Sequence, residues 1–169
     1  MRHSGVTRSL ESVAVEPMTP GSEPARRILR QYFDELVSRY CRRQATEEEI
    51  DSAIRDYPSD DLAPPGGLLL VARDPSAVLG CAGLFLLPGG VGEVTRVFVV
   101  SSARGTGLAE RLMHETDVHA RALGVHELRL TVRRDLVEAQ RLYARIGYEP
   151  IAPLDDRPYA DHWLRKRLA

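Results

Sequence analysis

The chain has 169 residues, of which 43% are hydrophobic and 28% are charged, and its formal net charge is −1. These values fit one globular domain, and so small a charge gives no long-range attraction to nucleic acid or to an anionic membrane. No apolar run approaches the roughly 20 residues that span a bilayer, and residues 1–11 lack the apolar stretch of a secretion signal. We therefore expect a cytoplasmic protein with no nucleic-acid or membrane partner, while a homodimer stays open.

The polar segment at the start of the chain, residues 1–11, is expected to be a mobile leader, followed by one domain over residues 12–169. The two cysteines, Cys41 and Cys81, lie far apart in the sequence and are expected to be reduced thiols. Neither has a neighbouring cluster of histidines or cysteines at metal-ligand spacing. We therefore predict no metal site.

Two helices are predicted early in the domain, after a short strand over residues 12–18. Apolar side chains recur at helical spacing over residues 25–40, and a serine and a proline just before them are typical start signals. Residues 46–49 are typical of a capping box that opens the second helix. A proline-rich loop over residues 56–67 ends this helical part.

The rest of the chain alternates between strand and helix patterns. Strands are predicted over residues 67–73, 77–87, 91–100 and 127–132, at Tyr148 and over residues 159–167, and helices over residues 105–123 and 136–146. Residues 91–132 are long enough only for a strand–helix–strand crossover, which makes its two strands parallel. Because ligands of such sheets bind at the carboxyl ends of the strands, the site should lie at residues 99–106.

A glycine-containing loop occupies this position. Arg104-Gly105-Thr106-Gly107 follows a strand and opens a helix. Glycines let backbone N–H groups approach a ligand closely, and the first turn of a helix offers unpaired N–H groups that favour a phosphate or pyrophosphate. A tight turn with no ligand is the simpler interpretation. A dinucleotide-binding loop would need a third glycine at Glu110, and a P-loop would need Gly-Lys-Ser/Thr, which is absent.

This loop resembles the acetyl-CoA-binding motif of the GNAT superfamily of acetyltransferases, Gln/Arg-x-x-Gly-x-Gly/Ala. Its three specified positions are filled by Arg104, Gly107 and Ala109. Upstream, Glu93-x-x-Arg96-Val97-Phe98-Val99 is similar to the fourth strand of that family, and residues 139–148 resemble its A-x-x-L-Y-x-x-x-G-F/Y motif. The ending at residues 158–163 is similar to the last strand of one bacterial branch.

The resemblance implies an α/β fold of the α+β type. This GNAT fold is a single domain with a mixed, mostly antiparallel sheet that is splayed at a central parallel strand pair, with helices on both faces. It also implies acetyl-CoA as co-substrate and transfer of its acetyl group to a primary amine of a small molecule or protein, by direct attack in a ternary complex. The implied cofactor-binding residues are Val97, Phe98, Val99, Arg104, Gly105, Thr106, Gly107, Leu108, Ala109 and Tyr143.

Two side chains are candidates for proton transfer. Glu93 stands where the family often has a catalytic carboxylate, although it could equally be a strand carboxylate paired with an arginine such as Arg96. Tyr143 matches the family's general acid, although its spacing also suits a core tyrosine. For the oxyanion, the resemblance implies a backbone N–H near Val99, next to a strand bulge.

The chain departs from the family pattern at Leu136, where an asparagine often holds the pantetheine arm of the cofactor. This difference motivates an alternative function, namely an acyl-CoA-binding sensor module without turnover.

Overall fold

The computed structural model describes residues 9–169, so most of the predicted leader lies outside the described residues. Within the described part, Leu10–Ser12 forms a short 3-10 helix, and Arg111 Nη1 donates a hydrogen bond of 3.2 Å to the carbonyl oxygen of Leu10. The end of the segment that we expected to be mobile is thus tied to the domain.

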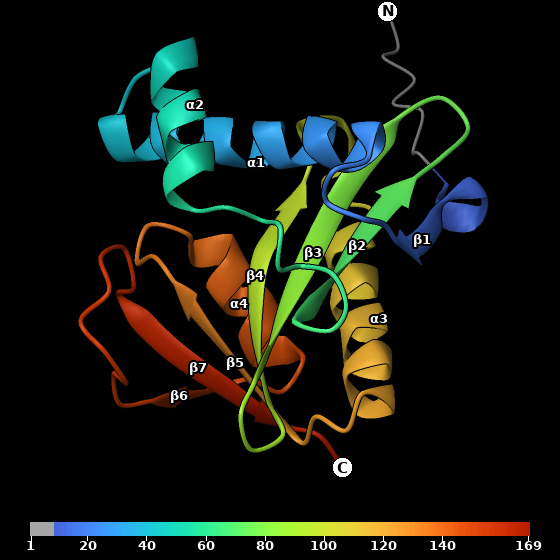
Figure 1. Ribbon diagram of the computed structural model, residues 1–169, viewed down its shortest axis with the longest axis vertical. Helices are drawn as coiled ribbons and strands as arrows, with labels where there is room; N and C mark the ends of the chain where they lie inside the picture. The colour runs from blue at the N-terminus through green and yellow to red at the C-terminus, as the bar shows by residue number, and fades with distance from the viewer. Residues whose placement is uncertain (1–8) are drawn as a thin grey trace, which may run out of the picture.

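One sheet and the helices on its two faces make up the described chain (Figure 1). The strands are β1 (Ala14–Pro17), β2 (Gly67–Arg73), β3 (Val78–Leu87), β4 (Val91–Val99), β5 (Glu127–Val132), β6 (Glu149–Ile151) and β7 (His162–Arg167). The α-helices are α1 (Glu23–Cys41), α2 (Glu47–Asp56), α3 (Leu108–Ala122) and α4 (Val137–Arg145). The strands form a seven-stranded sheet in the order β1-β2-β3-β4-β5-β7-β6.

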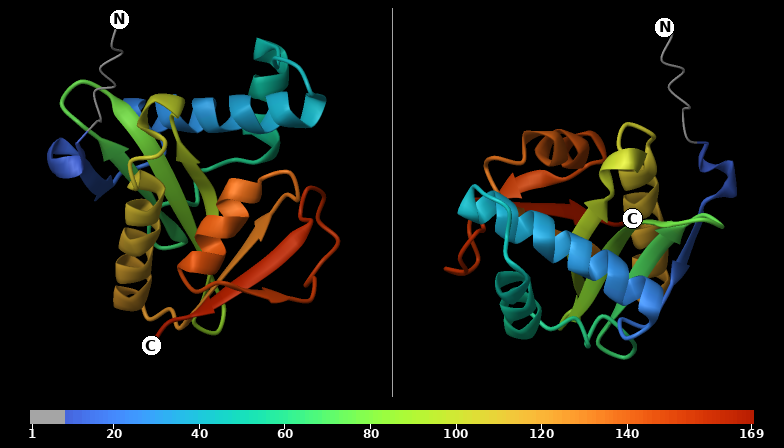
Figure 2. Two further views of the ribbon diagram at one scale, coloured as in Figure 1. Left: turned by 180° about the vertical axis from the view of Figure 1, so that it is seen from behind. Right: turned by 90° about the horizontal axis from the view of Figure 1, so that it is seen from above.

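Helices cover both faces of the sheet, α1 and α2 on one face and α3 and α4 on the other (Figure 2). Successive strand residues point to opposite faces, so the continuous apolar run of β2 can serve both layers. Leu69 and Val71 pack in a cluster with α1, whereas Leu68 and Leu70 pack in a cluster with α3. The predicted mixed fold with helices on both faces is confirmed.

The central strands β4 and β5 form the only parallel pair of the described sheet, and they separate along their length. Their pairing covers Val91–Glu93 against Glu127–Arg129 and stops there, while the other neighbours in the sheet pair antiparallel. Beyond this point the two strands diverge toward their carboxyl ends (Figure 1). The expected splay is therefore present, and it opens the sheet next to the glycine loop.

Three local predictions needed correction. Helix α3 begins at Leu108 and not at residue 105, because Gly105 and Gly107 hold positive φ angles of 75° and 85°, which a helix excludes. Strand β7 begins at His162 and not at residue 159, because Tyr159 has a φ of 69°. Tyr40, the last residue of the predicted apolar stripe over residues 25–40, is 58% exposed, since the end of α1 extends past β4 and over the splay (Figure 1).

No helix in residues 9–169 is long and apolar enough to cross a membrane.

Two other local predictions are confirmed. The second helix begins as predicted, with Thr46 Oγ1 accepting a hydrogen bond of 3.2 Å from the N–H of Glu49. Cys41 and Cys81 are free thiols, as expected.

Candidate active site

A cavity of about 750 Å³ lies on the α3–α4 side of the splay. Its walls are the end of β4, the loop that leads into α3 and α4 along its length, with Glu35 and Arg39 of α1 at the edge. Of the residues predicted to bind a cofactor, those that line it are Val97, Phe98, Val99, Arg104, Gly105, Gly107, Leu108, Ala109 and Tyr143. The splay thus brings residues from the two separate sequence motifs to one cavity.

The glycine loop presents free backbone to this cavity. The first backbone N–H of α3 with a helical partner is that of Arg111, which donates to the carbonyl of Gly107 over 3.0 Å. A Cβ atom built on Gly105 or Gly107 would meet nothing within 4 Å, so open space adjoins both glycines. Unpaired N–H groups beside open space at a helix start suit the pyrophosphate of a coenzyme A ester. The glycine loop is therefore compatible with the pyrophosphate of acetyl-CoA.

Two polar side chains of the loop are engaged within the protein. Arg104 donates to the carbonyl of Val99 over 3.1 Å and pairs with Glu35 of α1 at 2.8 Å, so its charge is partly compensated at the edge of the cavity. Thr106 does not line the cavity, because its hydroxyl turns back and donates to the carbonyl of Ala103. Of these two candidates, only Arg104 faces the space where a ligand would lie.

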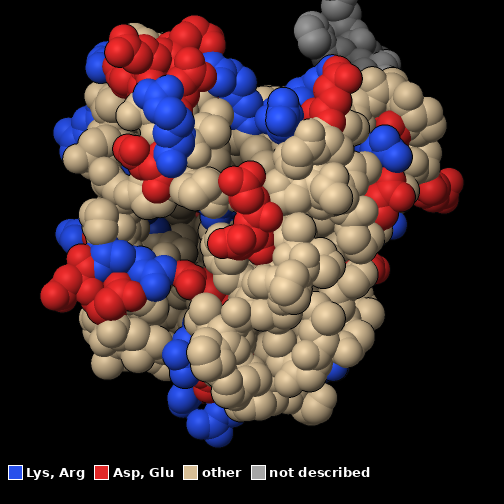
Figure 3. Space-filling view, viewed as in Figure 1, with Lys and Arg blue, Asp and Glu red and all other residues tan. Residues whose placement is uncertain are grey.

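A second cavity, of about 660 Å³, lies on the α1–α2 side of the splay. It is bounded by α1 and α2, by β4 and β5, and by the loop before β7. In the space-filling view it is the hollow between the lobe formed by α1 and α2 and the loop between β6 and β7, with charged side chains around its mouth (Figure 3). We call it the acceptor cavity.

The two cavities meet at four residues that line both of them, namely Val97, Leu136, Ala139 and Tyr143. Val97 comes from β4, and the other three come from the start and the inner face of α4. A ligand that entered from the α3–α4 side would meet a ligand from the other side at this junction. Leu136, the departure from the family pattern, thus lies at the meeting point and makes the junction more apolar.

Tyr143 is buried at the junction with its ring 5.8 Å from that of Tyr148. In the described chain no residue forms a hydrogen bond with its hydroxyl. Burial raises its pKa above the ordinary value for tyrosine, so the hydroxyl keeps its proton at neutral pH. Tyr143 is therefore a core residue that also lines the junction and whose hydroxyl has no hydrogen-bond partner among the described residues.

The bulge of β4 lies at Arg96 and Val97, where one extra residue shifts the register with β3 and Arg96 adopts a φ of 53°. The N–H of Val100 bonds to β3, so strand alternation turns the N–H of Val99 toward the gap. Val97 lies two residues earlier on this edge and reaches both cavities, whereas Val99 reaches only the first.

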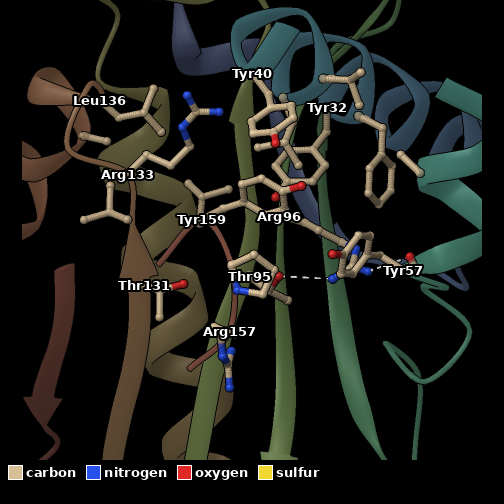
Figure 4. A pocket seen from close by; sticks show the side chains of 18 of the residues that line it. Tyr32, Tyr40, Tyr57, Thr95, Arg96, Thr131, Arg133, Leu136, Arg157 and Tyr159 are labelled. Atoms are coloured by element: carbon tan, nitrogen blue, oxygen red, sulfur yellow. Dashed lines mark hydrogen bonds between the residues drawn. The ribbon is translucent and has the colours of Figure 1, made fainter. Parts of the chain in front are cut away.

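Arg96 extends from the bulge into the wall of the acceptor cavity (Figure 4). It donates to Ser59 Oγ at 2.9 Å, to Thr95 Oγ1 at 3.0 Å and to the carbonyls of Tyr57 and Pro58 at 2.9 and 3.3 Å. All four partners are neutral, and burial lowers the pKa of this arginine. Arg96 is therefore a buried cation that no hydrogen-bonded carboxylate compensates.

Glu93 lines the acceptor cavity and is ion-paired, although with Arg157 and not with Arg96 as we had considered. Arg157 also pairs with Asp155 at 2.8 Å, and its guanidinium lies 4.7 Å from the ring centroid of Trp163. The paired carboxylates raise the pKa of Arg157. If Glu93 accepted a proton, its ion pair with Arg157 would weaken.

Several lining residues escaped the sequence reasoning. Arg157 has no motif and reaches Glu93 only because the loop before β7 folds back onto β4. Tyr57 lies in the predicted proline-rich loop, Tyr159 was expected to begin the last strand, and Tyr40 ended the apolar stripe of α1, so none of the three was predicted to line a site. The three tyrosines are far apart in the sequence, so no sequence signal grouped them.

Comparisons with known proteins agree with this geometry. Residues 23–148 match the model of the acetyltransferase (GNAT) family. A curated relative, the IAA acetyltransferase of Azospirillum brasilense, is 34% identical over 116 residues, which cover 63% of this chain and 76% of the relative. The chain therefore belongs to the GNAT acetyltransferase family, whose reaction is acyl transfer from acyl-CoA.

Solved structures show the same fold. The PaiA N-acetyltransferase of Thermoplasma acidophilum, in complex with coenzyme A, superposes with a TM-score of 0.72 at 19% identity, over 92% of this chain and 99% of that one. A GNAT acetyltransferase of Staphylococcus aureus superposes with a TM-score of 0.71 at 12% identity, over 93% of this chain and 99% of the other. A protein with this fold thus binds coenzyme A.

Proposed function

We propose that this protein transfers an acetyl group from acetyl-CoA to a primary amine by direct attack within a ternary complex. The observation that carries the proposal is the junction, where a cavity suited to a coenzyme A ester meets a second cavity from the opposite face of the sheet. Two reactants held in this way would react as if in one molecule, which removes much of the entropic cost of their encounter.

The residues at the junction suggest which chemical group assists each step of the reaction. Tyr143 would protonate the departing thiolate, because its hydroxyl is free and keeps its proton. The N–H groups of the free edge of β4 would stabilise the oxyanion, and we favour Val97 over the neighbourhood of Val99 because only Val97 lines both cavities.

A covalent acyl-cysteine is a poor fit to this site. Burial raises the pKa of Cys81 to about 12, and its thiol donates to the carbonyl of Arg96 at 3.1 Å. Burial and the neighbouring Glu49 raise the pKa of Cys41 as well. Since the thiolate is the nucleophile, neither cysteine is activated, which supports direct attack by the amine.

Steady-state kinetics with thiol detection tests the proposal. Direct transfer requires both substrates to be bound together, so double-reciprocal plots at several amine concentrations should intersect. Parallel lines would indicate a covalent intermediate and contradict the mechanism.

The sensor function remains the second candidate, because Leu136 places an apolar side chain where both ligands would meet. It predicts stabilisation by acetyl-CoA with no thiol release for any amine tested, whereas the enzyme must release thiol.

A further inference from the structure

The acceptor cavity concentrates the aromatic side chains of the chain. The sequence has six tyrosines, three phenylalanines and one tryptophan, and five of these tyrosines and one phenylalanine line this cavity. Apart from Tyr143 at the junction, they form what we call the aromatic wall: Tyr32, Phe33, Tyr40, Tyr57 and Tyr159. These residues come from α1 and from two loops, and all of them line the acceptor cavity. The four tyrosines of the wall are labelled in Figure 4.

Three members of the aromatic wall have no role in the core. Tyr40, Tyr57 and Tyr159 are 58%, 48% and 44% exposed, although they lie around a cavity mouth. Tyr159 also holds a backbone φ of 69°, a left-handed conformation that is strained for a bulky residue and is often found where a ligand is held. Because these rings are half exposed and line a cavity, a ligand can pack against them.

The charges of the cavity argue against a polycationic ligand. A second ammonium group would need its own carboxylate, yet Glu49 pairs with Arg43 at 2.9 Å and Glu93 pairs with Arg157. Asp56 is the one lining carboxylate for which the described residues provide no ion pair. Arg96 adds a buried cation whose hydrogen-bond partners are all neutral, which disfavours a second ammonium group and favours the neutral, nucleophilic form of an amine.

The shape of the mouth argues against a polypeptide. The rings of Tyr40 and Tyr159 meet edge to face with centroids 4.8 Å apart. They join the end of α1 to the loop before β7 and so bridge two walls of the cavity. A peptide chain laid across the gap between these walls would have to break this contact, whereas a small molecule need not.

We propose that the acceptor is a small primary amine with a single positive charge and an aromatic body, that is, an arylalkylamine, rather than a polyamine or a protein amino group. This inference rests on the proposed function and narrows its substrate. The ring packs against the aromatic wall, where aromatic pairs add to the burial of apolar area, and the amine points toward Val97 and Tyr143 at the junction.

The test compares phenethylamine and tryptamine with spermidine, n-propylamine and a lysine-containing peptide. We expect kcat/KM for the two arylalkylamines to exceed that for the other three by about tenfold or more. Calorimetric titration of phenethylamine into protein saturated with coenzyme A measures binding without turnover. If spermidine or the peptide is the best substrate, the inference fails while the proposed function stands. If phenethylamine binds and no amine releases thiol, the proposed function fails while the binding class stands.

Variants locate the effect. Tyr40→Ala should lower kcat/KM for phenethylamine by about tenfold, whereas Tyr40→Phe, which keeps the ring, should stay within about twofold. Leu154→Ala is the matched control, since Leu154 is 53% exposed in the loop before β7 and does not line the cavity. Equal losses in Tyr40→Ala and Leu154→Ala would overturn the role of the aromatic wall.

A change of charge gives a test in the opposite direction. Arg43→Ala should free Glu49 and raise kcat/KM for spermidine several-fold relative to phenethylamine. If the ratio of kcat/KM for spermidine to that for phenethylamine is unchanged in this variant, the ion pairs of the lining carboxylates are not what excludes polyamines, and the charge argument fails.

Discussion

At the residue scale, Tyr143 packs in the core and is also the proposed proton donor. It closes the core between α4 and the sheet, yet its hydroxyl is free of partners in the described chain and faces the junction of two cavities. Because burial raises its pKa, the same packing that stabilises the fold also keeps the proposed acid protonated.

Tyr143→Phe removes this hydroxyl and keeps the ring, so any loss should be chemical. A thiol with a pKa near 8.5 can leave as a thiolate but benefits from a proton, and positioned acids contribute about 10²- to 10⁴-fold. Because the thiol is a good leaving group, we expect the low end, a fall in kcat of roughly 10- to 100-fold. The melting temperature and acetyl-CoA affinity should stay close to wild type. Turnover within about twofold of wild type, with chemistry rate-limiting, would assign Tyr143 to packing alone.

Glu93 would have to loosen an ion pair to act as the proton acceptor, because Arg157 occupies its carboxylate. If Glu93 is the base, Glu93→Gln should lower kcat most at neutral pH and recover in part at high pH, where the amine is already neutral. Arg157→Gln should then raise kcat at neutral pH relative to kcat at high pH, because the variant frees the carboxylate of Glu93 to accept a proton. If neither variant alters the shape of the pH–rate profile, water removes the proton.

The difference between these two residues shows what sequence can predict. Tyr143 belongs to a motif within one helix, so its position relative to neighbouring residues follows from local geometry. The partner of Glu93 is 64 residues away in the chain, and no local pattern identifies it. We had considered Arg96, which instead binds the loop after α2.

At the element scale, the start of α3 is where the backbone itself forms the site. Gly107 precedes the helix with a φ of 85°, and the space beside it is open. At the other end of α3, Gly124 has a φ of 81° and open space as well. The two glycines are alike in conformation and differ in what lies beside them, since only Gly107 lines one of the two cavities described above.

Gly107→Val and Gly124→Val therefore form a matched pair. Each forces a branched residue into a left-handed conformation, and each should cost about 1 to 2 kcal/mol of stability. Only Gly107→Val places a side chain where the pyrophosphate would lie, so only this variant should lose acetyl-CoA binding, as measured by calorimetry. Equal affinity in the two variants would mean that the phosphate loop lies elsewhere.

At the scale of the whole molecule, each face of the sheet has one cavity at the splay between β4 and β5. The cavity suited to the coenzyme A ester lies on the side of α3 and α4, and the acceptor cavity lies on the side of α1 and α2. The two ligands would not compete for one entrance. The limited pairing of β4 with β5 makes this arrangement possible.

Acetyl-CoA should stabilise the folded protein. A ligand at 100 times its dissociation constant contributes about 2.7 kcal/mol, which for a domain of this size corresponds to a rise in Tm of roughly 5 to 10 °C. Thermal unfolding with and without millimolar acetyl-CoA measures this shift, and acetate serves as the control. No shift would contradict both the enzyme and the sensor function.

Residue pattern alone determined the features that depend on neighbours in the chain. Helical spacing and the crossover over residues 91–132 predicted the helices and the parallel strand pair, and the paired glycines predicted a loop at the start of α3, because backbone geometry is set over a few residues. Only the tertiary structure decided which side chains face each other across the splay. The Glu93–Arg157 pair, the bridge between Tyr40 and Tyr159 and the exposed end of α1 depend on where separate elements meet. That placement is a result of packing over the whole domain, and no window of sequence contains it.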